Sequence, residues 1–189
     1  MLPDYSTYTD SALFAVLMSG ASSAELAFGE IYKRHSRRLY LYCTKITGNK
    51  QDAHDIFQEA WIKFHSVATS TQTCVENVAG YIFRIARNLY LNKKNERQID
   101  IVTYEDVYSS SKANQLENME QLEVVEMLKR ALDLLDDDYR EAYVLHELDD
   151  MPYEEISAIT GSTVAALKNR VWRARKHIRT YLAPLLSSS

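Results

Sequence analysis

Residues 163–182, TVAALKNRVWRARKHIRTYL, contain six basic side chains and no acidic one. The basic residues are Lys168, Arg170, Arg173, Arg175, Lys176 and Arg179. Apolar residues recur between them every three or four positions, which predicts a helix with one buried stripe and one basic face. The stripe is Val164, Leu167, Val171, Ala174, Ile178 and Leu182. A basic face suits a polyanion such as nucleic acid, because Lys and Arg pair with phosphate. The alternative is a basic amphipathic helix that packs within a bundle or rests on another acidic surface.

The residues before this segment predict a shorter helix and a tight turn. Pro152 suits the start of a helix, and Glu154 and Glu155 favour the positive end of its dipole. Thr160-Gly161-Ser162 predicts the turn, after which Ser162 or Thr163 can cap the next helix. Two helices joined in this way form a helix-turn-helix, whose second helix enters the major groove of DNA. The residues expected to face DNA are Ser162, Thr163, Ala165, Lys168, Asn169, Trp172, Arg173 and Lys176.

Aromatic and basic residues also alternate in YIFRIARNLYLNKKNER, residues 81–97. Aromatic rings stack on unpaired bases while cations follow the phosphates, so the segment is a candidate site for single-stranded nucleic acid. The candidates are Tyr81, Arg84, Arg87, Asn88, Tyr90, Lys93, Lys94 and Arg97. The alternative is that the tyrosines are half-buried core residues.

A third candidate surface is acidic and lies in QDAHDIFQEAW, residues 51–61. Asp52, Asp55 and Glu59 fall at positions i, i+3 and i+7, on one helical face, with Gln58 beside them. In a domain that is otherwise basic, such a stripe indicates a protein partner with a basic surface. Acid–base chemistry, a metal site and a simply solvated face are the alternatives.

Enzymatic and metal-binding motifs are missing from the sequence. The 5 histidines are scattered, and the 2 cysteines form no CxxC pair. There is no glycine-rich phosphate loop, nucleophile elbow or HExxH motif. We therefore expect no catalytic residues, no metal and no cofactor.

The elements that would position these surfaces are helices. The 189 residues include only 5 Gly and 3 Pro, and no segment alternates convincingly between apolar and polar residues, so we expect an all-α fold. Two helices are expected over 11–47, ended by Gly48-Asn49 and begun in the second case by Ser22 or Ser23. The other expected helices span residues 51–66, 78–97, 119–135 and 137–148. Residues 66–77 are small and polar and predict a loop.

The chain is expected to form two small helical domains, residues 1–97 and 119–189, joined by a flexible acidic linker over residues 98–118. The formal charge of −4 is unevenly distributed: +5 over residues 25–97, −8 over 98–138, −5 over 139–160 and +6 over 161–189. Because salt screens charge within about 10 Å, the local basic zones matter more for nucleic-acid binding than the total.

The sequence also bears on location. The first residues, MLPDYSTYTD, do not resemble a signal peptide, and no apolar run approaches the roughly 20 residues that span a bilayer. We therefore expect no membrane insertion and a cytoplasmic location, which suits a chain without a disulfide framework.

Three segments resemble bacterial RNA polymerase sigma factors of the extracytoplasmic-function (ECF) group. They are LYCTKITGNKQDAHDIFQEAWIKFH, AGYIFRIARNLYLNKKNER and LLDDDYREAYVLHELDDMPYEEISAITGSTVAALKNRVWRARKHIRTYL. They resemble the family's second domain, its promoter-melting helix and its fourth domain, in that order. His54, Ile56, Tyr81, Ala165-Ala166-Leu167 and Trp172 depart from the usual residues; the last two changes bear on the promoter sequence that is read.

The resemblance implies a subunit that directs core RNA polymerase to promoter DNA and assists melting. Asp52, Asp55, Gln58 and Glu59 would then dock on the clamp helices of the β′ subunit. The melted −10 strand would be held by Tyr81, Arg84, Arg87, Asn88, Lys93 and Arg97, with a flipped base in the 66–77 loop. The recognition helix would read the −35 element, the linker would run toward the RNA exit channel, and the β flap and an anti-sigma factor would be further partners. The alternatives are a helix-turn-helix regulator that is not a polymerase subunit, and a helical adaptor without a nucleic-acid role.

Overall fold

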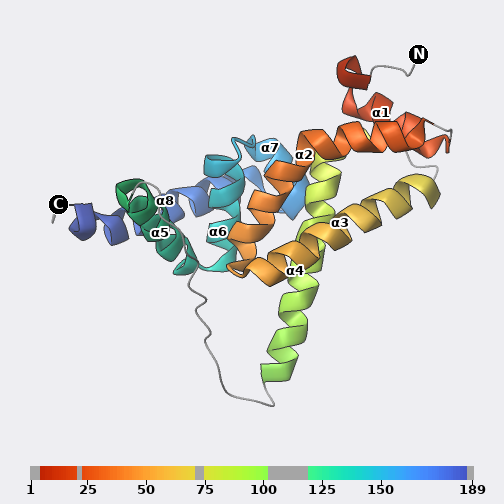
Figure 1. Ribbon diagram of the computed structural model, residues 1–189. Helices are drawn as coiled ribbons and strands as arrows, with labels where there is room; N and C mark the ends of the chain where they lie inside the picture. Colours follow the sequence, from red (N-terminus) through yellow and green to blue (C-terminus); the bar gives the residue numbers. More distant parts are fainter. Residues whose placement is uncertain (1–4, 21–22, 71–74, 102–118, 187–189) are drawn as a thin grey trace.

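The computed structural model describes residues 5–20, 23–70, 75–101 and 119–186, without the side chains of 97–101, 119–125 and 184–186. Every secondary-structure element in these ranges is a helix, which confirms the expected all-α fold (Figure 1). The N-terminal part contains η1 (Tyr5–Thr7), α1 (Asp10–Met18), α2 (Ala24–Thr47), α3 (Lys50–Ser70) and α4 (Val78–Ile101). The C-terminal part contains α5 (Met119–Asp133), α6 (Asp137–Tyr143), the π-helical turn η2 (Val144–Leu148), α7 (Tyr153–Thr160) and α8 (Val164–Leu186).

Short-range capping explains where the N-terminal helices begin and end. Gly48 ends α2 in the left-handed conformation, with φ 64°, as expected from the Gly48-Asn49 pair. Asn49 then caps α3, because its Oδ1 accepts hydrogen bonds from the backbone N–H of Gln51 at 2.8 Å and of Asp52 at 3.1 Å. Ser23 precedes α2 but makes no side-chain capping bond, and Ser22 lies outside the described residues.

Helices α1 to α4 surround an apolar core that includes Phe14, Ile31, Phe64 and Phe83. On α4 the apolar residues Ile82, Ala86 and Leu89 are buried, but Ile85 is only half-buried. Phe83 is instead fully buried. The difference arises because α4 is covered on more than one side, by α2 and α3 and also by α7.

The C-terminal helices pack along α8, which contacts α5, α6 and α7. The predicted stripe on α8 is confirmed: Leu167, Val171, Ala174 and Ile178 are buried. Its two ends, Val164 and Leu182, are half-buried.

Two expectations about helix ends need correction. Residues 66–70 continue α3 instead of starting a loop, because Ala68 packs into the core; residues 71–74 lie outside the described ranges. Helix α4 runs on to Ile101, into the range expected to be the linker. The remainder of that linker, residues 102–118, lies outside the described residues.

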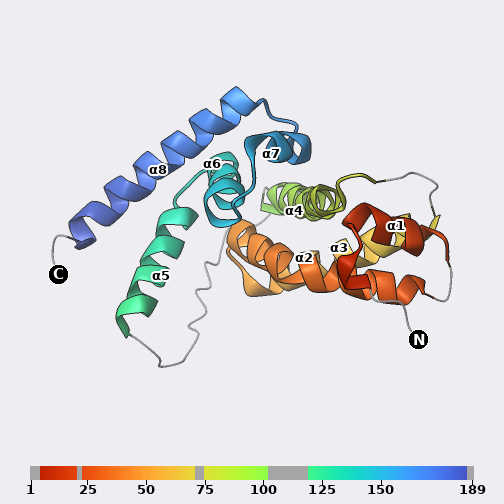
Figure 2. The same ribbon diagram turned by 90° about the horizontal axis from the view of Figure 1, so that it is seen from above.

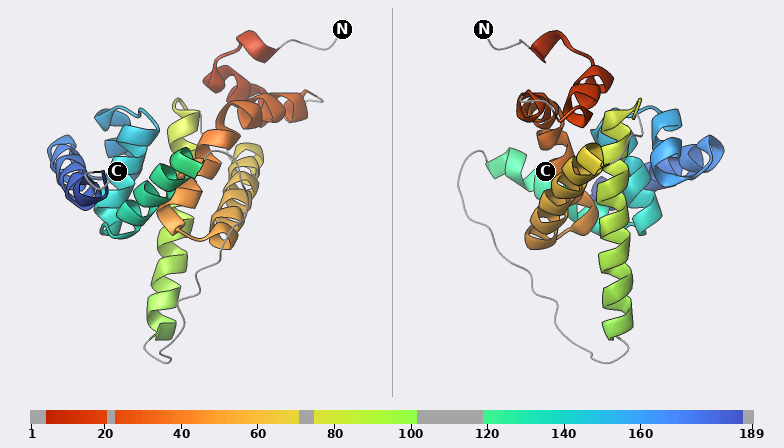
Figure 3. Two further views of the ribbon diagram at one scale, coloured as in Figure 1. Left: turned by 60° about the vertical axis from the view of Figure 1, so that its left-hand side comes forward. Right: turned by 90° about the vertical axis from the view of Figure 1, so that its right-hand side faces the viewer.

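The two helical parts pack against each other. The sequence patterns did not predict this arrangement. Helix α4 contacts α7, while α2 contacts α6 and η2. Figure 2 shows α6 and α7 beside α4 and α2, and Figure 3 shows α4 between α3 and the C-terminal helices.

Candidate nucleic-acid interface

The turn before α8 is set by local hydrogen bonds. Gly161 adopts φ 73°, and the Ser157 hydroxyl donates to the Ser162 carbonyl at 2.7 Å. Of the two expected caps, Thr163 is the one used: its Oγ1 accepts from the backbone N–H of Ala166 at 3.2 Å. The Ser162 hydroxyl oxygen instead accepts a hydrogen bond from Arg170 at 2.8 Å.

The face of α8 opposite the buried stripe is exposed. Its exposed members are Ala165, Lys168, Asn169, Trp172, Arg173 and Lys176, with Thr163 at the start and half-buried Ser162 beside it. The Trp172 side chain is 60% exposed, and the Lys176 ammonium lies 5.7 Å from its ring centroid. The Lys168 ammonium lies 5.7 Å from the Tyr153 ring. The arrangement presents positive charge and a large ring on one exposed helical face.

Two other α8 arginines hold the helix in place. Arg170 pairs with Asp138 of α6 at 2.7 Å, and Arg175 pairs with Glu147 of η2 at 2.6 Å. Helices α5 and α8 border an open groove of about 690 Å³. Its lining is Ala131, Leu134, Leu135, Trp172, Arg173, Lys176, His177, Thr180 and Tyr181.

The acidic stripe on α3 divides into a buried end and an exposed end. Asp52 is only 6% exposed, and its Oδ1 lies 2.8 Å from the Lys93 ammonium of α4. Asp55 is half-buried and also contacts Lys93, at 3.1 Å, whereas Gln58 and Glu59 are exposed. The hydrogen bond that the Lys93 ammonium donates to Asp52, opposed by desolvation, raises the pKa of Lys93. The Asp52–Lys93 contact therefore ties α3 to α4.

The basic face of α4 meets the C-terminal helices. Arg87 Nε lies 2.9 and 3.1 Å from the two carboxylate oxygens of Glu141 on α6. Arg84 donates to the Ala158 carbonyl of α7, and Lys94 pairs with Asp137 of α6.

The other expected α4 residues lie elsewhere on the helix. Asn88 is exposed, and the half-buried Tyr81 ring lies 6.4 Å from that of Phe64. Tyr90 donates to Asp137 at 2.9 Å. The side chain of Arg97 lies outside the described residues.

Glu141 is at the centre of this interface, and no pattern in the sequence indicated its role. It is only 9% exposed, and it accepts a second hydrogen bond from the Tyr42 hydroxyl of α2 at 2.8 Å. Burial, followed by the charge of Glu141, raises the pKa of Tyr42, so the phenol remains a donor. Burial disfavours ionisation of nearby Asp137, but hydrogen bonds from Lys94 and Tyr90 outweigh it and lower the pKa of that carboxyl.

Asp149 forms the next contact between the two parts. Arg38 of α2 donates to the Asp149 carbonyl at 2.7 Å. The Asp149 carboxylate oxygen Oδ2 is buried and has no hydrogen-bond partner among the described residues, and desolvation raises the pKa of Asp149 to about 6. The positive charges of Arg38 and Lys45 oppose that rise.

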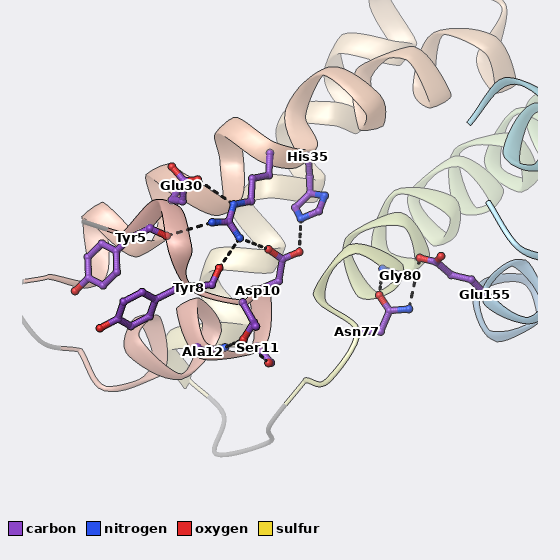
Figure 4. A network of polar contacts seen from close by, with 12 residues as sticks. Tyr5, Tyr8, Asp10, Ser11, Ala12, Glu30, His35, Asn77, Gly80 and Glu155 are labelled. Carbon is purple, nitrogen blue, oxygen red and sulfur yellow. Dashed lines mark hydrogen bonds and ion pairs between the residues drawn. The ribbon is translucent and has the colours of Figure 1, made fainter. Parts of the chain in front are cut away.

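Figure 4 shows polar contacts at the other end of the N-terminal helices. Arg34 of α2 binds Asp10 at 2.8 Å and Glu30 at 2.9 Å, and donates to the carbonyls of Tyr5, Ser6 and Tyr8. His35 Nε2 lies 2.6 Å from the second oxygen of Asp10. Further along, the Asn77 amide donates across to Glu155 of α7 at 3.5 Å, and so adds to the contact between the two parts.

Within the described residues, no group of three or more His, Cys, Asp or Glu is placed to hold a metal ion. None of the described helices is long and apolar enough to cross a membrane.

Comparison with known families matches both parts of the chain. Residues 31–98 match the family model "Sigma-70 region 2", and residues 125–178 match "Sigma-70, region 4". The first match runs from α2 to α4, and the second from α5 to α8.

Curated relatives and solved structures are similar over most of the chain. The ECF RNA polymerase sigma factor SigE of Mycolicibacterium smegmatis is 31% identical over 93% of this chain and 68% of its own length. The ECF RNA polymerase sigma-E factor of Escherichia coli is 32% identical over 71% of this chain and 76% of its own.

Two solved structures share the fold. The sigma factor RpoE from Bartonella quintana, in complex with the anti-sigma factor NepR, has a TM-score of 0.72 and 24% identity, and covers 82% of this chain and 96% of that one. CnrH, in complex with the cytosolic domain of CnrY, has a TM-score of 0.69 and 22% identity, and covers 93% and 97%. With the two regions matched in order and relatives above 30% identity, the chain belongs to the ECF group of sigma-70 factors, the subunits that direct bacterial RNA polymerase to promoters in transcription initiation.

Proposed function

We propose that three surfaces of this sigma factor divide the work of promoter recognition, with residues 1–97 acting as domain two, 98–118 as the linker and 119–189 as domain four. The observation that carries the proposal is the exposed cationic face of α8, which follows a capped helix-turn-helix turn. The match to region 2 disfavours both alternative functions, a regulator that acts without polymerase and an adaptor without a nucleic-acid role.

The face of α8 reads the −35 element as duplex DNA. Lys168, Arg173 and Lys176 supply positive charge for phosphates, while Asn169 offers both a donor and an acceptor to base edges. The small side chain of Ala165 permits a close approach to the groove. Trp172 is the largest exposed group on this face and is therefore expected to influence which sequence is read.

The exposed end of the α3 stripe docks on the clamp helices of the β′ subunit. Asp55, Gln58 and Glu59 are accessible, and Ile62, one turn further, is 67% exposed. Charged and apolar groups side by side suit a protein partner. Asp52 contributes indirectly, because it fixes α4 through Lys93.

The face of α4 holds the melted −10 strand. Arg84, Arg87 and Asn88 would contact the strand's phosphates and bases, with Tyr81 near an unpaired base and Lys93 and Arg97 further along the helix. Unstacking a base costs a few kcal/mol, so binding to polymerase must offset part of that cost.

Two further partners follow from the C-terminal part and from the solved relatives. The α5 side of the groove between α5 and α8, where Leu134 is 70% exposed, offers an apolar contact surface for the β flap, while Trp172, Arg173 and Lys176 on the α8 side are left to the −35 element. An anti-sigma factor is a further proposed partner, because the RpoE structure contains the anti-sigma factor NepR. The protein is proposed to act in the cytoplasm as a binding subunit, with no catalytic activity of its own.

The test of the α4 assignment separates polymerase binding from promoter opening. The Arg84→Ala, Arg87→Ala double variant is expected to bind core polymerase within about twofold of wild type, but to open promoters at least about tenfold more slowly, since two charge-assisted contacts are lost. The matched control, Lys33→Ala with Arg37→Ala, removes two positive charges from exposed positions on α2.

Because Arg84 and Arg87 also contact domain four, Asn88→Ala provides a second test that leaves those contacts in place. Fluorescence of a base analogue in the −10 region would report opening. Unchanged opening by both the double variant and Asn88→Ala would contradict the assignment.

A further inference from the structure

Two lysines on the exposed face of α8 lie over aromatic rings, but the two rings are held in different ways. The Lys176 ammonium is 5.7 Å from the ring centroid of Trp172, which is on the same helix and is 60% exposed. The Lys168 ammonium is 5.7 Å from the ring centroid of Tyr153, which is half-buried and is the first residue of α7. Figure 2 shows α7 beside the beginning of α8. Lys168 is therefore held by a neighbouring element, whereas Lys176 is held by a ring that its own helix carries.

The position of the Tyr153 ring is fixed by the chain around it. Pro152 precedes it in an extended conformation, with φ −66° and ψ 149°, and so sets where α7 begins. The imidazole of His146 stacks on the ring, with centroids 4.0 Å apart and planes at 28°. His146 Nδ1 donates in turn to the Met151 carbonyl at 3.0 Å, because a carbonyl oxygen can only accept. The ring is therefore held from η2 and from the loop before α7, and it has little freedom to turn.

The charges beside this stack keep the Tyr153 phenol neutral. Glu147 Oε1 lies 3.6 Å from His146 Nε2 and 2.6 Å from a guanidinium nitrogen of Arg175. Burial raises the pKa of Tyr153, the positive charge of Arg175 opposes that rise, and the charge of Glu147 adds to it. The ring beside Lys168 is therefore an uncharged phenol, and the ammonium is attracted to its face.

A lysine held in this way can bind phosphate at a lower entropic cost. A free lysine side chain occupies many rotamers, and the loss of that freedom on binding opposes the contact. The Tyr153 ring restricts Lys168 to fewer rotamers before DNA arrives, so part of that entropy is already lost in the free protein. Because an ammonium has three donors, it can face the ring on one side and a phosphate oxygen on the other.

We propose that Tyr153 is a positioning residue for duplex binding, whose ring holds the Lys168 ammonium ready for a DNA phosphate before the duplex arrives. The proposal rests on the assignment of α8 to the −35 duplex. It gives the first helix of the helix-turn-helix a role in DNA binding that passes through a residue of the second.

The first experiment measures whether Tyr153 acts through Lys168. Tyr153→Leu removes the ring, Tyr153→Phe keeps the ring without its hydroxyl, and each change is also combined with Lys168→Ala. Tyr181→Leu, which removes a half-buried tyrosine near the other end of α8, is the matched control. Fluorescence anisotropy of a labelled duplex of mixed sequence reports binding by the full chain, since phosphate contacts do not depend on sequence. Circular dichroism shows that each variant is folded.

Tyr153→Leu is expected to weaken duplex binding about fivefold, while Tyr153→Phe and Tyr181→Leu stay within about twofold of wild type. In the Lys168→Ala background, Tyr153→Leu should change binding by less than about twofold, because no ammonium is left for the ring to hold.

Four results would overturn the proposal. Tyr153→Leu could bind as well as wild type, or it could cause the same loss with and without Lys168, which would show that the ring acts independently. Tyr153→Phe could lose as much as Tyr153→Leu, which would show that the hydroxyl binds DNA directly. Lys168→Ala alone could leave duplex binding unchanged, and only this result would also place the fault in the assignment of α8.

A second experiment observes the lysine itself, without DNA. A methylene group over the face of an aromatic ring has its NMR signal shifted upfield by the ring current. In protein made with isotope-labelled lysine, Lys168→Arg identifies the ε-methylene signal of Lys168 by its disappearance. This signal should move downfield in Tyr153→Leu and keep its position in Tyr153→Phe. The same position in wild type and Tyr153→Leu would overturn the proposal, even if duplex binding had fallen.

Discussion

Two basic helices in this protein have opposite surroundings. The cationic face of α8 is exposed, and its Lys168 and Lys176 lie over aromatic rings. On α4, by contrast, Arg87 and Lys94 pair with carboxylates of α6. The acidic middle of the chain is therefore more than a solvated face, since two of its residues neutralise the helix assigned to single-stranded DNA. Local charge in the sequence therefore does not show which cations are free to bind a ligand.

The largest expected difference between the two helices is in stability. Arg87→Ala leaves Glu141 buried without its positive partner and should lower the free energy of unfolding by about 3 kcal/mol. Arg175→Ala breaks a pair whose arginine is 53% exposed, so the loss should be below about 1 kcal/mol. Urea unfolding followed by circular dichroism measures both, and equal losses would contradict the contrast between a buried and an exposed ion pair.

A smaller effect is expected in duplex binding by α8. Asn169→Ala should cost about 1–3 kcal/mol and relax the preference at one base pair, whereas Lys168→Ala should weaken all sequences alike and reduce the salt slope by about 1. Fluorescence anisotropy on a set of −35 duplexes at several salt concentrations separates these effects. Lys94→Ala on α4 is the control, because the Lys94 side chain pairs with Asp137 and should leave the salt slope for duplex unchanged.

The smallest effect concerns pH and the interface near Asp149. Its folded pKa of about 6 lies above the usual value of 3.8, so the folded state binds more protons between these values. The contribution of Asp149 to stability therefore falls as the pH rises from about 4 to above 6.

Asp149→Asn should consequently raise the free energy of unfolding at pH 7 by about 1 kcal/mol, discounted for partial exposure, and flatten the profile between pH 5 and 7. The control is Asp150→Asn, an exposed neighbour with φ 50°, a conformation that Asn tolerates. An identical pH profile for Asp149→Asn and wild type would show that burial of this carboxyl has no energetic effect.

The local features were the ones that the sequence could predict. The helix end at Gly48, the turn at Gly161 and the α8 stripe each depend on residues within a few positions of one another, so periodicity and turn chemistry were sufficient. The helical extension over 66–70 was missed because Ser, Thr and Val are weak helix formers, and packing of Ala68 overrides that preference.

The contacts between α4 and α6 could not be predicted from the sequence for a different reason. Arg87 and Glu141 are 54 residues apart, and no short-range pattern marks their pairing. The i, i+3, i+7 spacing on α3 correctly placed Asp52, Asp55 and Glu59 on one side of a helix, but it could not show that Asp52 turns inward to Lys93.

That sequence separation has a consequence during synthesis of the chain. Ribosomes add about 5–20 residues per second, so Arg87 is made roughly 3 to 10 s before Glu141. Through that interval the newly made domain two has its cationic helix but not the acidic helix that neutralises it. The last third of the chain to be made therefore supplies the carboxylates of Glu141 and Asp137 that pair with Arg87 and Lys94.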